Sequence, residues 1–77
     1  KWSLKKDKLF REFEFNDFVQ AFGFMAQAAI IAESLDHHPD WSNSYNKVKV
    51  ELSTHDADGI TSLDFNLASK MDSIAKG

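Results

Sequence analysis

The three histidines of this chain lie in two short polar segments, Asp36-His37-His38-Pro39 and Ser53-Thr54-His55-Asp56. Histidine is the side chain whose ordinary pKa allows it to gain or lose a proton near neutral pH. A single histidine in such a segment most often caps a helix or fills a turn. An adjacent pair with a third in a similar polar context favours an acid–base site, so we take His37, His38 and His55 as candidate catalytic residues.

Two kinds of chemistry could use three imidazoles. One is metal ligation, because three histidines beside a carboxylate resemble a zinc or iron site, although adjacent histidines can share a metal only where the backbone turns sharply. The other is metal-free proton transfer, with one imidazole as base and another, protonated, as acid. Neighbouring imidazolium charges repel, which favours a mixed protonation state. We therefore favour proton transfer over metal ligation.

Four strands are expected around these segments. Alternation of apolar and polar residues predicts a first hairpin of Trp2–Leu4 and Leu9–Phe15. A second hairpin is predicted from Trp41–Tyr45 and Val48–Leu52, closed by Asn46-Lys47, since asparagine tolerates the positive φ of a two-residue turn.

Two helices complete the predicted order β-β-α-β-β-α. Asn16 is the expected N-cap of a helix over residues 17–35. Thr61 and Asp64 have the spacing of a capping box at the start of a last helix, which ends near Gly77. We assign Asp64 to this cap and leave it out of the catalytic set. The order predicts an α+β fold, a four-stranded antiparallel sheet with helices packed on one face.

The 17–35 helix is more apolar than one sheet requires. One apolar stripe consists of Phe18, Phe22, Met25 and Ala29, and a second of Ala21, Phe24, Ala28, Ile31 and Leu35. A helix that covers a single sheet needs one such stripe. We therefore predict a homodimer or homotetramer that forms through this helix, and expect aspartate at Phe24 or Ala28 to dissociate the oligomer or unfold the subunit.

Length and composition set further bounds. The 77 residues make one small domain, residues 1–77, which buries only about 60% of its unfolded surface and gains from a partner subunit. The absence of cysteine is consistent with a reducing compartment, and no signal-peptide pattern occurs at the N-terminus, so a cytoplasmic protein is expected. The net charge of −3 without a basic cluster argues against nucleic-acid binding. The apolar stretch 18–32 is too short for a membrane span.

The predicted topology suggests how the histidines could meet. Glu33 and His37 are four residues apart, so they share a face if the helix persists. Pro39 disfavours helical geometry at His38, which ends the helix by that point. His37 and His38 then enter the second hairpin and His55 leaves it. Because entry and exit of a hairpin lie side by side, we expect the three imidazoles to converge.

These motifs together resemble a known family. The residues concerned are Glu33-x-x-x-His37-His38-Pro39-Asp40-Trp41, Asn43-x-Tyr45-Asn46-Lys47-Val48, Leu52-Ser53-Thr54-His55-Asp56, Gly59 and Asp64. In this pattern, and in flanking residues over essentially the whole chain, the sequence resembles the pterin-4a-carbinolamine dehydratases. These are also known as the dimerisation cofactor of a hepatocyte homeodomain transcription factor. Family members usually carry another helix before the position of Trp2.

The resemblance implies a metal-free and cofactor-free dehydration of 4a-hydroxytetrahydropterin to quinonoid dihydropterin, a step in tetrahydrobiopterin recycling. It implies that His37 and His55 form the acid–base pair while His38 positions the pterin ring. Trp41 could line the pocket or belong to the core. The implied substrate-binding residues are Asp36, His37, His38, Ser53, Thr54, His55 and Asp56. The resemblance also implies an alternative, a protein-interaction module that binds a transcription factor as a protein partner.

Overall fold

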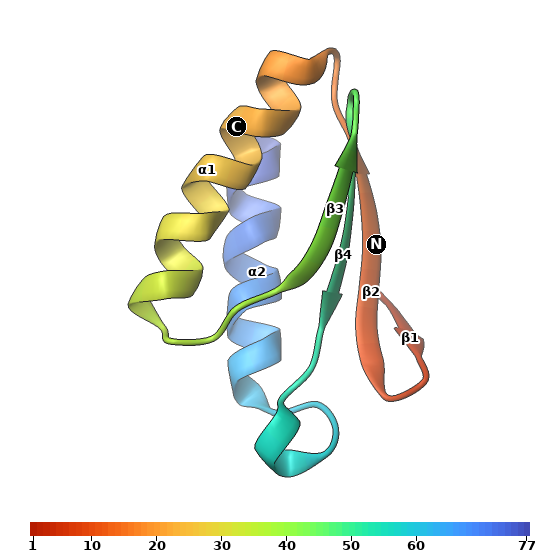
Figure 1. Cartoon of the computed structure of the whole chain (residues 1–77), viewed down its shortest axis with the longest axis vertical. Coiled ribbons are helices and arrows are strands. Elements are labelled where there is room, and N and C mark those ends of the chain that lie inside the picture. Colours follow the sequence, from red (N-terminus) through yellow and green to blue (C-terminus); the bar gives the residue numbers. More distant parts are fainter.

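Two helices cover one face of a four-stranded antiparallel sheet in the computed structural model, which describes all 77 residues (Figure 1). The strands are β1 (Ser3–Lys5), β2 (Lys8–Glu14), β3 (Asp40–Ser44) and β4 (Lys47–Leu52). The helices are α1 (Phe18–Ser34) and α2 (Ser62–Lys76), with a short 3₁₀ helix, η1 (His55–Ala57), between β4 and α2. The predicted α+β fold and element order are confirmed.

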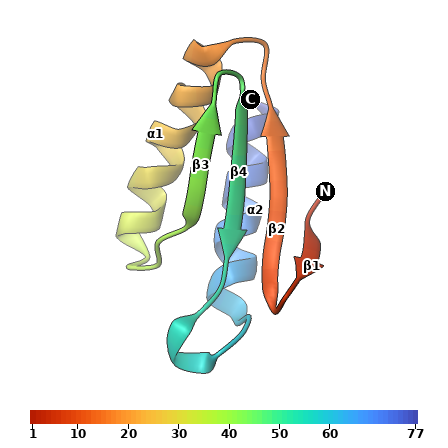
Figure 2. The same ribbon diagram turned by 45° about the vertical axis from the view of Figure 1, so that its right-hand side comes forward.

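The strand order in the sheet is β1-β2-β4-β3, so the two hairpins meet along β2 and β4 (Figure 2). Leu9 lies opposite Leu52 and Phe13 lies opposite Val48 in this central pair. These apolar residues point toward the helices, while Glu12 and Lys49, opposite each other between them, are exposed on the other face, as the period of two requires. The start of the edge strand β3 lies beside the end of β4, so the segment that carries His37 and His38 and the segment that carries His55 adjoin the same end of this strand pair.

The hairpin boundaries differ from the expected ones by one residue. The first turn consists of Lys6 and Asp7, both with positive φ, which is the geometry of a type I′ turn. The second turn consists of Tyr45 and Asn46, so the expected Asn46-Lys47 turn is wrong. Tyr45 adopts the positive φ, and Asn46 instead bonds the end of β2: its side-chain amide donates to the Phe15 carbonyl at 2.8 Å.

The N-cap of α1 is Asp17 and not Asn16. The Asp17 carboxylate accepts a hydrogen bond from the main-chain N–H of Gln20 at 2.9 Å. The Gln20 side chain in turn accepts from the main-chain N–H of Asn16 at 3.3 Å. The two bonds resemble a capping box, except that Gln20 accepts from the residue before the cap, and α1 starts one residue later than expected.

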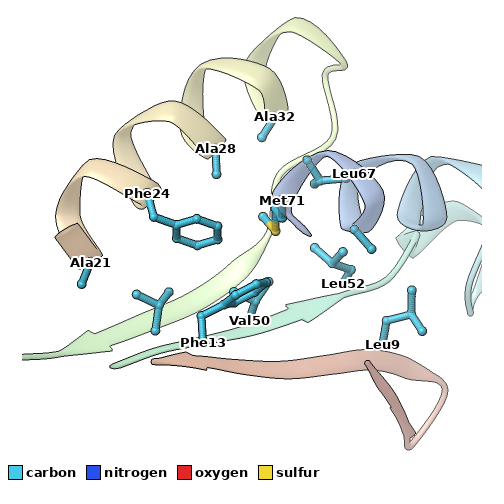
Figure 3. Close-up of a cluster of buried hydrophobic side chains, with 12 residues drawn as sticks. Leu9, Phe13, Ala21, Phe24, Ala28, Ala32, Val50, Leu52, Leu67 and Met71 are labelled. Atoms are coloured by element: carbon cyan, nitrogen blue, oxygen red, sulfur yellow. The ribbon is translucent and has the colours of Figure 1, made fainter. Parts of the chain in front are cut away.

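The core lies between the helices and the sheet (Figure 3). On α1, the buried side chains are Ala21, Phe24, Ala28 and Ala32. Three of these four are alanines, which let α1 approach the sheet and α2 closely. The Phe24 ring supplies most of the apolar volume on this face, with its centroid 4.6 Å from that of Phe13.

The other face of α1 is exposed. Phe18, Val19, Phe22 and Ile30 are all exposed there, Phe22 by 58% of its surface and Ile30 by 72%. The two apolar stripes therefore differ in role: the stripe with Phe24 belongs to the subunit core, whereas the stripe with Phe22 is exposed except at Met25, which is half-buried against the core. Of the two outcomes expected for aspartate at Phe24 or Ala28, burial of both residues in the subunit core favours unfolding of the subunit. No helix has the length and apolar character needed to cross a membrane.

Candidate active site

The end of α1 turns His37 toward the protein interior. Leu35 is the C-cap, and Asp36 follows with φ of 51°, in the left-handed region. The main-chain N–H of Asp36 donates to the Glu33 carbonyl, and that of His37 donates to the Ala32 carbonyl at 3.0 Å. These two bonds form a Schellman motif, in which the second residue beyond the cap packs back against the helix. His37 occupies that position and is buried.

The buried imidazole of His37 meets a buried carboxylate. Its Nε2 lies 2.5 Å from Oδ1 of Asp64, whose side chain is fully buried. Asp64 comes from the first turn of α2, 27 positions further along the chain. Burial of a charged group is unfavourable unless it is paired and hydrogen-bonded, so this contact ties the end of α1 to the start of α2.

Asp64 also serves as the helix cap that the sequence predicted. Its Oδ2 accepts a hydrogen bond from the main-chain N–H of Thr61 at 2.9 Å, which completes the capping box. The sequence predicts only this cap for Asp64, and its contact with His37 is an addition from the structure. A signal was present, since Asp64 belongs to the family motif. Because a carboxylate has two oxygens, one residue performs both tasks.

Thr54 connects this pair to the segment that carries His55. Its hydroxyl donates to Oδ2 of Asp64 at 2.8 Å and lies 2.8 Å from the hydroxyl of Thr61. The main chain of Thr54 pairs with Gly59, with one hydrogen bond of 2.7 Å, and closes the loop between them. This loop contains η1, which begins at His55 and exposes its side chain. The two histidine segments are therefore linked through Asp64.

His38 points the other way and remains exposed. Its Nε2 lies 2.8 Å from Oε1 of Glu33 on the surface. The expected pairing of Glu33 with His37 is wrong, because α1 ends at Ser34 and the left-handed residue Asp36 rotates the chain before His37.

The other predicted site residues surround these segments. Ser53 is half-buried, whereas Asp36 and Asp56 are exposed. A cavity of about 180 Å³ lies beside η1; its lining residues are Lys6, Asp7, Lys8, Ser53, Thr54, His55, Asp58 and Gly59. Five of these eight residues, three from the first hairpin and two from the end of the loop, are not among the site residues predicted from the sequence. A larger cavity of about 740 Å³ beside Trp2 and Asp72 contains no histidine.

Two further expectations concern the geometry of the histidines. The ring hydrogen bonds lead to Asp64 and Glu33, and none joins two imidazoles, so the convergence of all three remains a prediction. No three side chains of histidine, aspartate or glutamate are grouped as metal ligands. Trp41 is half-buried and packs against the hydrophobic core, which was one of its two expected roles.

The fold and the site together define a small α+β protein with a buried histidine–aspartate pair at the junction of two helices. The family model described as Pterin 4 alpha carbinolamine dehydratase matches residues 1–74. A protein of Solibacter usitatus, provisionally named a pterin-4-alpha-carbinolamine dehydratase, is 53% identical over 76 residues, or 99% of this chain and 80% of that protein. A Rhizobium meliloti protein with the same provisional name is 56% identical over 78 residues, or 99% and 75%. The chain belongs to the pterin-4a-carbinolamine dehydratase family.

Solved structures agree with this assignment. A crystal structure from Brucella melitensis, described as a transcriptional coactivator/pterin dehydratase, has a TM-score of 0.95 and 53% identity. The match covers 96% of this chain and 81% of that one. A pterin dehydratase-like protein described as a RuBisCO assembly factor in the alpha-carboxysome has a TM-score of 0.80 at 21% identity, over 97% and 87% of the two chains. At that identity, the likeness concerns the fold alone.

Proposed function

We propose that this protein dehydrates 4a-hydroxytetrahydropterin to quinonoid dihydropterin and water, as a step in the recycling of a tetrahydropterin. The observation that carries the proposal is the network in which Asp64 joins His37 to Thr54, beside His55. It brings together the two segments that the family resemblance assigns to pterin binding. Membership of the family and 53% identity to the coactivator/dehydratase structure support the same activity.

The reaction needs one base and one acid. A base removes the proton from a pterin ring nitrogen, and the electron pair of that N–H bond forms the new C=N bond. The bond from carbon 4a to oxygen breaks, and the hydroxyl leaves as water after an acid gives it a proton. Imidazoles can fill both roles near neutral pH, each contributing about 10²- to 10⁴-fold. We assign the roles to His37 and His55, with His38 positioning the ring.

An ultraviolet absorbance assay with synthetic 4a-hydroxytetrahydropterin tests this proposal. The protein should accelerate dehydration well above the buffer rate. Activity should survive dialysis against a chelator, because elimination from this activated carbinolamine requires no Lewis acid. A folded sample with no more activity than buffer would refute the dehydratase activity. Loss of activity when a bound metal is removed, and its return when the metal is added back, would refute the metal-free mechanism.

The exposed face of α1 supports a second proposal, that the protein self-associates through this helix. Phe18, Val19, Phe22 and Ile30 form an apolar patch on one side of a small subunit, and such patches mark interaction sites. Phe22→Asp should dissociate the oligomer while leaving the subunit folded, as sedimentation and circular dichroism would show. Gln27→Glu adds a charge to the same helix outside the patch and is the matched control. A stable wild-type monomer at micromolar concentration would contradict this proposal.

The same patch suits the alternative role of the chain as a protein-interaction module. The similar Brucella melitensis protein is described as a coactivator as well as a dehydratase. A pure adaptor has no need of a histidine buried against a carboxylate, so the site favours the enzyme. The two roles separate experimentally: Phe22→Asp should weaken protein binding and spare dehydration in the subunit, whereas His55→Ala should do the reverse.

A further inference from the structure

The imidazole of His37 has two nitrogens, and only one of them is engaged. Nε2 lies 2.5 Å from Oδ1 of Asp64, whereas Nδ1 has no hydrogen-bond partner. Nδ1 is nevertheless not a buried unpaired atom, because Nε of Arg11 is the one fully buried side-chain polar atom that lacks a partner. Nδ1 therefore reaches solvent through the exposed tenth of the His37 side chain.

The engagement of Nε2 follows from the shape of the ring. A half-turn of the imidazole about its bond to Cβ exchanges Nε2 with Cε1, and would place a carbon against the Asp64 carboxylate. Only Nε2 can therefore form the hydrogen bond to Oδ1, and only Nδ1 remains available to another molecule.

Asp64 also determines which nitrogen carries the hydrogen. The Thr61 N–H and the Thr54 hydroxyl both donate to its Oδ2, so this carboxylate acts as an acceptor in the network. Oδ2 carries no hydrogen of its own, and when Asp64 is ionised Oδ1 can also only accept, so that Nε2 of His37 is then the donor. In a neutral imidazole with hydrogen on Nε2, Nδ1 has a free lone pair and is a base.

We propose that Asp64 is a positioning residue for the dehydration: it keeps the hydrogen on Nε2 of His37, so that Nδ1 takes the proton from the pterin. The inference rests on the proposed function and deepens it, since His37 becomes the base and His55 the acid. The proton moves to Nδ1, the N–H electron pair forms the C=N bond, and the hydroxyl leaves as water with the proton from His55. Asp64 then stabilises the imidazolium, as the buried aspartate does in Ser–His–Asp triads.

The first test is the tautomer of His37 in the wild-type protein without substrate. Nitrogen-15 NMR that correlates ring nitrogens with ring hydrogens distinguishes hydrogen on Nε2 from hydrogen on Nδ1. We expect the Nε2–H form, and addition of a stable dihydropterin should shift the Nδ1 resonance more than the Nε2 resonance. An Nδ1–H form, or a shift confined to Nε2, would overturn the inference.

The second test is Asp64→Asn. The asparagine oxygen would still accept from Thr61 and Thr54, which turns its NH₂ group toward Nε2 of His37. A donor at that place forces the hydrogen onto Nδ1 and removes the base. We expect the Nδ1–H tautomer and a kcat about 10²-fold lower or more, with a much smaller change in KM. A residue that only caps the helix would lower Tm but leave the tautomer unchanged and kcat within a few-fold.

Asp72→Asn is the matched control for removal of an α2 carboxylate. Asp72 bonds Trp2 and Arg11, away from the histidines. This variant should keep both the wild-type tautomer and kcat.

A folded Asp64→Asn protein with near-wild-type kcat would overturn the positioning role. If Asp64→Asn does not fold, the wild-type tautomer and the dihydropterin titration decide. An inactive wild type with the Nε2–H tautomer would refute the proposed function and the role of Nδ1 in it, and would leave the tautomer assignment standing.

Discussion

His37 and His55 lie at the entry and the exit of the β3–β4 hairpin, but their surroundings differ. His37 is buried, and its ring is bonded to the fully buried Asp64. His55 is exposed at the start of η1, and its side chain forms no hydrogen bond. In the first region, the proposed chemistry and the stability of the fold depend on the same contacts. In the second region, the side chain is free to act on a substrate while contributing little to folding.

The difference follows from the backbone on either side of the hairpin. The Schellman motif at the end of α1 directs His37 back against the helix. The loop that begins at Thr54 closes on Gly59 through main-chain hydrogen bonds, so that His55 lies on its outside. Substitution of each histidine therefore separates its contribution to catalysis from its contribution to stability. The combined loss should be larger for the buried His37 than for the exposed His55.

The largest effect is expected for His37→Ala. It should lower kcat about 10²-fold or more, as loss of a general base does. It also leaves one oxygen of the buried Asp64 without its ring partner, which costs about 1–3 kcal/mol. Each kcal/mol corresponds to about 4–8 °C of Tm in a domain of this size. Calorimetry measures the fall in Tm and the dehydration assay measures the fall in kcat, on one sample. An unchanged Tm would show that Asp64 does not depend on the ring.

A loss of activity without a loss of stability is expected for His55→Ala. kcat should again fall about 10²-fold or more, because this imidazole is the proposed acid. The free energy of unfolding should change by no more than about 0.5 kcal/mol, as for an exposed residue without specific contacts. Full activity in this variant would remove His55 from the mechanism. A large fall in Tm would mean that the two regions do not differ as the structure indicates.

The sequence predicted the element types and their order, because hydrophobic periods of two and 3.6 residues are strong signals. It placed boundaries less well where neighbouring residues compete. Asn16 and Asp17 are both good N-caps, and only the hydrogen bond from the Gln20 main-chain N–H to the Asp17 carboxylate decides between them. The β3–β4 turn shifted by one residue because Asn46 bonds Phe15, a contact between distant parts of the chain.

The candidate site also divides into features that the sequence predicts and features that only the structure gives. The residue types and segments could be named from the sequence, but the partners of the rings could not. The spacing of Glu33 and His37 implies contact only while the helix continues, and α1 ends at Ser34. The contact of His37 with Asp64 joins residues 27 positions apart and depends on how α1 packs against α2. Local patterns carry no information about such packing.

An intermediate effect is expected for Thr54→Val, which keeps the shape of the side chain and removes the hydroxyl. Oδ2 of Asp64 would lose one of its two donors, at a cost of about 1 kcal/mol. Because the hydroxyl helps to hold Asp64, kcat should fall by a few-fold through a less well-oriented His37. Thr54→Ser retains the hydroxyl and is the matched control. It should keep the wild-type stability in thermal melts and the wild-type kcat in the assay. A loss in Thr54→Ser with none in Thr54→Val would show that the methyl group, and not the hydroxyl, matters.

The smallest effect is expected for Glu33→Gln, which tests the exposed counterpart of the His37–Asp64 pair. Glu33 and His38 form the same kind of contact, with 2.8 Å between Nε2 and Oε1, but their side chains are 80% and 58% exposed. Exposed pairs of this kind contribute about 0–1 kcal/mol, because water and salt screen the charges. Tm should therefore remain within a few degrees of wild type. kcat should stay within about two-fold, and KM should change slightly if His38 positions the pterin. The same pair of measurements made on Asp64→Asn gives the comparison, since there the carboxylate is fully buried. A tenfold fall in kcat in Glu33→Gln would mean that His38 depends on its carboxylate as His37 does, and that burial is not what distinguishes the two adjacent histidines.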